Sequence, residues 1–101
     1  MKRTKNMVYN PTCESRELML FAVNDGDIYR RAATATINNL RKKHIDGTYD
    51  KEKAIDAWYY VANLASNKYF SEFGYKFSVS DRFTCAVEME DYYKEEVEFV
   101  A

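Results

Sequence analysis

The 101-residue sequence has few of the residues that break helices, with three glycines and one proline. So low a content disfavours a β-sandwich, which needs many tight turns, and favours long helices joined by few corners. An excess of charge of one sign is also missing, because the formal net charge at pH 7 is −1. The chain as a whole is therefore not drawn electrostatically to nucleic acid or to acidic membranes. No apolar run approaches the ~20 residues that cross a bilayer, so we expect no membrane association.

Recognisable catalytic and metal-binding motifs are absent from the sequence as well. Cys13 and Cys85 lie far apart in no metal-ligand spacing and, with no signal peptide, are expected to be reduced thiols in the cytoplasm. The single histidine, His44, could act as a base if a carboxylate such as Asp46 oriented it. Its place among cations at a helix end is more typical of a histidine that caps the helix terminus. No phosphate-binding loop, dinucleotide fingerprint or zinc-protease motif occurs. We therefore expect no enzyme, no cofactor and no bound metal.

The spacing of apolar residues predicts an all-α fold. We expect a flexible basic N-terminal tail over residues 1–10 and a single helical domain over residues 11–101. The domain is predicted to be a compact bundle of three long helices plus a shorter N-terminal helix. The short helix is expected over 13–23, and the long helices over 27–43, over 51–73 and from a Ser78 or Ser80 cap to beyond Val97. A strand remains the alternative for residues 18–23, because periodicity alone cannot assign a short apolar run.

The NDGD stretch, residues 24–27, is interpreted as a corner between two helices. A calcium-binding loop would need oxygen ligands spaced as D-x-D-x-D-G with a glutamate at its twelfth position, and this stretch has neither. Gly26 permits a sharp reversal of the chain, and Asp25 or Asp27 can cap the helix that follows.

The helix expected over 27–43 carries five cations and no acid after Asp27. These cations are Arg30, Arg31, Arg41, Lys42 and Lys43. Arg30 and Arg41 are eleven residues apart, close to three helical turns, so such a stripe could follow the phosphates of a nucleic acid, with Asn38 and Asn39 touching bases. The alternative, which we favour because the net charge is near zero, is that this helix faces the acidic last helix within the fold or across a dimer. Arg41 and Lys42 are expected to be exposed.

Tyrosines are unusually frequent, and several follow one another along a helix. Trp58, Tyr59 and Tyr60 are consecutive, and consecutive helical residues point about 100° apart, so all three cannot lie in one core. With Trp58 inside, Tyr59 or Tyr60 is expected at the rim, as is Tyr92 on the last helix. Rim tyrosines are typical of protein interfaces, although they can also cover a small core.

Five segments in this order resemble a loose group of small uncharacterised helical proteins of tailed phages and related mobile elements. The segments are ELMLFAVND (17–25), IYR (28–30), NLRKK (39–43), GTYD (47–50) and KAIDAW (53–58). Thr36 stands where a proline is common in the group, so the kink that this proline implies does not carry over. The resemblance implies a phage-like origin and a compact helical fold, and it brings no activity, cofactor or site. Small phage proteins of this kind often bind host or viral proteins.

We therefore expect a small, non-catalytic, cytoplasmic accessory protein of phage type, located in the host cytoplasm if a phage encodes it. Its function would be stoichiometric binding of a protein partner, such as a host defence or replication factor, through Tyr59, Tyr60 and Tyr92. Binding of nucleic acid through the basic helix is the first alternative, and a minor structural role in the virion is the second. Self-association remains open.

Overall fold

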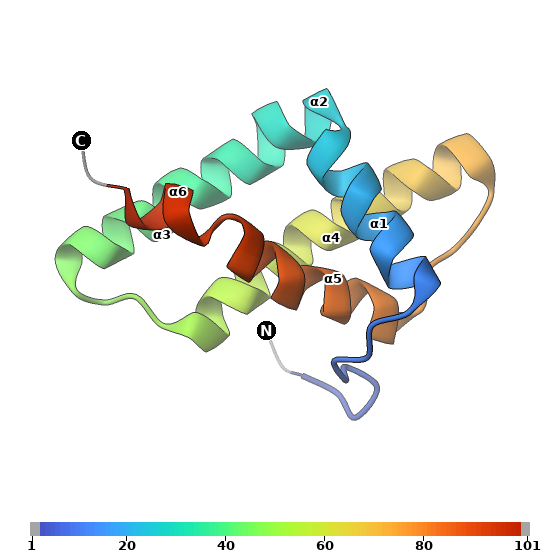
Figure 1. Cartoon of the computed structure of the whole chain (residues 1–101), viewed down its shortest axis with the longest axis horizontal. Helices are drawn as coiled ribbons and strands as arrows, with labels where there is room; N and C mark the ends of the chain where they lie inside the picture. The colour runs from blue at the N-terminus through green and yellow to red at the C-terminus, as the bar shows by residue number, and fades with distance from the viewer. Residues whose placement is uncertain (1–2, 100–101) are drawn as a thin grey trace.

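The computed structural model describes residues 3–99, which form helices and contain no strand (Figure 1). The elements in chain order are α1 (Cys13–Asn24), α2 (Gly26–Ile28), the π-helical turn η1 (Tyr29–Ala33), α3 (Thr34–Asp46), α4 (Lys51–Phe73), α5 (Val79–Tyr92) and α6 (Lys94–Glu98). The all-α prediction is confirmed, and the strand alternative for residues 18–23 is excluded because they lie within α1.

The long helix α4 is the spine of the domain, and its bounds agree with the prediction. The Asp50 side chain accepts hydrogen bonds from the first free N–H groups of the helix. Gly74 ends the helix with φ 75°, a left-handed conformation that glycine adopts without steric cost. Helices α1 and α5 pack against α4 and against each other, and α6 lies on α3 (Figure 1).

A π-helical turn interrupts the helix that the sequence predicted over 27–43. The Thr34 N–H donates to the Tyr29 carbonyl five residues back, and the Thr34 hydroxyl donates to the same oxygen at 2.7 Å. This wider turn rotates fewer degrees per residue than an α-helix. It therefore changes the direction in which the preceding side chains point, relative to those of α3. The sequence spacing places Tyr29, Ala33, Ile37 and Leu40 on one inward face. The last three are buried, whereas Tyr29 is exposed and Ile28 takes the inward position.

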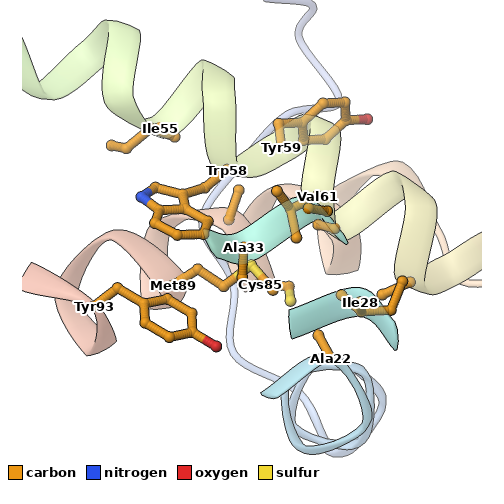
Figure 2. Packing of buried hydrophobic residues seen from close by; sticks show 14 of the residues in the cluster. Ala22, Ile28, Ala33, Ile55, Trp58, Tyr59, Val61, Cys85, Met89 and Tyr93 are labelled. Carbon is orange, nitrogen blue, oxygen red and sulfur yellow. The ribbon is translucent and has the colours of Figure 1, made fainter. Parts of the chain in front are cut away.

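The last helix breaks at Tyr93, which the sequence did not predict. The Tyr93 backbone has φ −95° and ψ 8°, and a short helix, α6, continues in a new direction. The Tyr93 ring stacks on Trp58, with ring centroids 4.8 Å apart and planes 14° apart. Both side chains are almost completely buried, and Figure 2 shows them in the core next to Met89. The break thus places one aromatic ring in the core and turns α6 onto α3.

The sequence predicted a flexible basic tail over residues 1–10, and the described part of this segment has partners on the domain. Arg3 forms an ion pair with Asp56 of α4 at 3.2 Å. The Asn10 N–H donates to the Thr84 hydroxyl of α5 at 2.8 Å. Residues 3–10 are therefore packed along α4 and α5, while the predicted flexibility itself stays a prediction.

Candidate functional site

The three tyrosines that the sequence proposed as a binding surface do not come together. Tyr60 and Tyr92 expose 65% and 57% of their surface, as expected at a rim. Tyr59 exposes only 9% and belongs to the core, so its predicted rim position is wrong. The central part of α4 is covered on more than one side, and this turns both Trp58 and Tyr59 inward. No aromatic contact joins Tyr60 to Tyr92 among residues 3–99.

The five predicted basic residues do not form one free stripe. Arg30 pairs with Asp27 at 3.0 Å, and the π-helical turn shifts it away from the face of Arg41. Arg41 is partly buried, because its guanidinium Nη2 donates to the Glu96 carbonyl at 2.7 Å and its Nε is enclosed. Its predicted exposure is therefore wrong, whereas Lys42 is exposed as expected. At Arg41 the cationic helix faces the last helix within the fold, although the acceptor is a backbone carbonyl. Arg31 is exposed and Lys43 is half-buried.

The NDGD stretch forms a corner stabilised by an ion pair. The Asp25 carboxylate accepts the Ile28 N–H at 3.0 Å, which caps the next helix, and contacts Lys68 Nζ of α4 at 2.7 Å. Lys68 and the Ile28 N–H hold the pKa of Asp25 below its ordinary value, and Asp25 raises the pKa of Lys68. The second carboxylate, Asp27, is 3.6 Å from the same ammonium. Both carboxylates therefore face a lysine ammonium group, which agrees with the interpretation of this stretch as a corner between two helices.

His44 and Cys85 are engaged in packing, whereas the Cys13 thiol is exposed. His44 stacks on Tyr49 with ring centroids 3.9 Å apart, and no hydrogen bond to Asp46 orients it in the part of the chain that the structure describes. Tyr49 in turn donates to the Glu90 carboxylate at 2.9 Å. Burial raises the pKa of the Cys85 thiol to about 12, so it stays protonated near neutral pH. Residues 3–99 contain no group of three histidine, cysteine, aspartate or glutamate side chains placed to hold a metal.

The structure instead brings together an aromatic surface that the sequence analysis missed. Helix α1 crosses the C-terminal half of α4, and a hollow of about 400 Å³ lies between them. A second hollow of about 220 Å³ continues it toward the start of α1. We call the two hollows together the α1–α4 groove, and its lining comprises Cys13, Glu14, Glu17, Leu20, Phe21, Asn24, Asp25, Tyr69, Phe73, Tyr75 and Phe77.

Tyr69 is the central ring of the groove. Phe21 contacts it edge-on at 5.2 Å between ring centroids, and Phe73 and Phe77 lie 4.7 Å and 4.9 Å away. Its hydroxyl donates to the Glu17 carboxylate at 3.3 Å, and partial burial together with that carboxylate raises the pKa of Tyr69. The phenol therefore remains a hydrogen-bond donor at neutral pH, and the rings support one another in a fixed arrangement.

Large apolar side chains at the edge of this groove face solvent. Leu20 of α1 exposes 51% of its surface and Phe73 of α4 exposes 64%. The sequence carries a signal for this surface, because residues 69–77 (YFSEFGYKF) contain five aromatic residues. That segment was interpreted as the end of a helix and a connection, since the position of α1 across it depends on the tertiary fold.

Helix α1 is fixed rigidly enough to form one wall of the groove. The Thr12 hydroxyl accepts the Ser15 N–H at 2.9 Å while the Ser15 hydroxyl accepts the Thr12 N–H at 2.8 Å. This reciprocal cap satisfies backbone N–H groups where the helix begins. The Thr12 hydroxyl also donates to Asp81 of α5 at 2.7 Å. Leu18 and Ala22 are fully buried beneath it.

Comparison with known proteins gave no match to a protein family, to a curated protein or to a solved structure. Among the described residues, no helix combines the length and the apolar composition that a membrane crossing requires.

Proposed function

We propose that this chain is a non-catalytic binding protein that recognises a protein partner through the α1–α4 groove. The observation that carries the proposal is the exposure of Leu20 and Phe73 at the edge of a groove lined by four further aromatic rings. Contiguous exposed apolar side chains on a small protein usually mark an interaction surface, because leaving them in water is unfavourable. Aromatic residues in particular are enriched at the centres of protein interfaces.

The packing of the groove suits it to binding without rearrangement. Tyr69 contacts three other rings and is hydrogen-bonded to Glu17, so its orientation is set before a partner arrives. A preformed surface loses little side-chain entropy on association, and more of the interaction energy is available as affinity. Tyr60 and Tyr92, the exposed tyrosines that the sequence singled out, do not line the α1–α4 groove and are not part of the proposed binding surface.

Nucleic-acid binding remains the alternative, with weaker geometric support. Arg30 is paired with Asp27 and Arg41 is tied to the backbone of α6, which leaves Arg31, Lys42 and Lys43 as the remaining cations of the predicted set. Binding led by phosphate contacts would weaken steeply between about 50 and 200 mM salt, whereas a groove centred on aromatic rings would respond little. Three further proposals neither depend on the groove nor follow from it. They are a phage-encoded accessory role, a cytoplasmic location and a minor structural role in the virion.

The proposal is tested by affinity capture of the full chain from a lysate of cells that naturally carry it, with and without nuclease. A groove variant, Leu20→Gln with Phe73→Gln, is compared with the matched control Tyr60→Gln, which removes an equally exposed aromatic side chain about 20 Å along α4. We expect one protein to be captured near stoichiometrically by the wild type and by the control, but not by the groove variant, in both nuclease arms. Capture that survives in the groove variant, or that disappears with nuclease, would refute the proposal.

A further inference from the structure

We infer that the α1–α4 groove accepts an amphipathic helix of the partner protein that carries lysine or arginine beside its apolar anchors. This inference rests on the proposed function and names the chemistry of the partner. It follows from two independent properties of the groove, its shape and its charge.

The shape of the groove matches a short helix. Glu17, Leu20, Phe21 and Asn24 follow the i, i+3, i+4, i+7 spacing of a single helical face, and all four line the groove along α1. Across the groove, Tyr69 and the residues that follow it supply the opposite wall. Helix α1 has 12 residues, and at 1.5 Å per residue it is about 18 Å long, which three turns of a second helix would cover. Such grooves receive amphipathic helices through anchors at the same spacing.

The charge of the groove selects the flanking residues of that helix. The charged residues that line it are Glu14, Glu17 and Asp25, and no lysine or arginine lines it. Asp25 is neutralised by Lys68, whereas neither glutamate has an ion-pair partner among residues 3–99. Two carboxylates without an ion-pair partner, of which only Glu17 accepts a hydrogen bond from Tyr69, lie beside exposed apolar side chains and favour a ligand that supplies cations at that point. A symmetric pairing of two copies through this face would instead bring the same two glutamates of each copy toward one another.

The test is a selection from a displayed library of random peptides of about sixteen residues, with the full chain as the target. The selection is repeated on the groove variant Leu20→Gln with Phe73→Gln, on the control Tyr60→Gln and on a charge variant, Glu14→Gln with Glu17→Gln, which keeps an oxygen that can accept the Tyr69 hydroxyl. Circular dichroism melting of each variant confirms that it is folded. We expect the wild type and the control to enrich peptides with apolar residues at i, i+3 or i+4 spacing and at least one adjacent lysine or arginine. Their Kd should rise about tenfold or more in the groove variant and in the charge variant.

The two proposals fail in distinguishable ways. Selected peptides that depend on Leu20 and Phe73 but are acidic or uncharged would overturn the partner chemistry and leave the proposed function standing. Peptides that bind the groove variant as tightly as the wild type, or the absence of any enriched peptide, would overturn the inference, and the lysate capture then decides the proposed function separately. A concentration-dependent dimer in sedimentation velocity that the groove variant abolishes would show that a second copy covers the groove, which also overturns the inference.

Discussion

At the scale of single residues, Trp58 and Asp25 show how the fold depends on particular side chains. Trp58 is fully buried and stacked on Tyr93, yet its indole Nε1 has no hydrogen-bond partner among the described residues. Its contribution therefore comes from ring packing, and it is reduced by the cost of an unpaired donor. Asp25 acts by charge, because one carboxylate both caps a helix and binds Lys68 of α4.

Replacing Trp58 by alanine is expected to destabilise the fold severely, and replacing it by phenylalanine is expected to destabilise it moderately. Trp58→Ala should lower the free energy of unfolding by about 3–5 kcal/mol, a large part of the 5–15 kcal/mol typical of a domain. Trp58→Phe should cost clearly less, because it keeps a ring against Tyr93 and removes the unpaired Nε1–H. Urea denaturation followed by far-ultraviolet circular dichroism measures both, and equal costs for the two variants would show that ring packing is not the main contribution.

The Asp25 ion pair should make stability sensitive to acid. Because its pKa is lowered in the folded state, the carboxylate stabilises the fold above the unfolded pKa of about 4, and this contribution is lost as the pH falls through the folded value. Asp25→Asn keeps an oxygen that can accept the Ile28 N–H but cannot pair with Lys68. The wild type should therefore be more stable at pH 7, and its advantage should shrink as the pH falls from about 5 to about 2. An advantage that does not change with pH would contradict the assignment.

At the scale of the elements, the termini of α1 and α4 were predictable from sequence, whereas the end of α3 at Asp46 and the interruptions within helices were not. The bounds of α4 follow from local chemistry, because Asp50 caps its start and Gly74 ends it, and the sequence alone indicates both signals. The break at Tyr93 accompanies the stacking of its ring on Trp58, and the π-helical turn lies where the chain packs against α1 and α4, so both are tied to tertiary contacts. The groove was missed for the same reason, because Tyr69 and Phe21 become neighbours only when α1 crosses α4.

The π-helical turn predicts an unusual tolerance of deletion. Removing Arg31 from η1 should convert the wide turn into a regular α-turn and keep Ile28 and Ile37 inward, so the melting temperature should change little. The matched deletion of exposed Asn39 within α3 should rotate the preceding helix by about 100° relative to Leu40 and unfold or strongly destabilise the domain. Circular dichroism melts of both deletion variants test this, and equal damage from the two deletions would contradict it.

The N-terminal segment should contribute measurable stability. The Ser80 hydroxyl donates to the Val8 carbonyl at 2.9 Å, and the Arg3 guanidinium lies 5.0 Å from the centre of the Phe83 ring. Deleting residues 1–10 should therefore lower the free energy of unfolding by about 1–3 kcal/mol, the net value of a few such contacts. Urea denaturation of the shortened chain gives the value, and an unchanged stability would support the flexible tail that the sequence predicted.

At the scale of the whole molecule, the buried core and the proposed binding surface lie in different parts of the domain. Helix α5 packs along α4, and the Trp58–Tyr93 stack lies in the buried core (Figure 2). The C-terminal half of α4 is covered only partly by α1 and leaves Leu20 and Phe73 in solvent. Substitutions at this edge should therefore affect binding far more than folding.

The most direct measurement is site-specific photocrosslinking in cells that naturally carry the protein. A photoreactive phenylalanine analogue replaces Phe73 at the edge of the groove, or Tyr60 elsewhere on α4 as the control. We predict a discrete protein–protein adduct from position 73 that resists nuclease and is absent from position 60. An adduct from position 60 but not 73, an adduct that nuclease removes, or no adduct from either position would contradict the assignment of the α1–α4 groove as the binding surface.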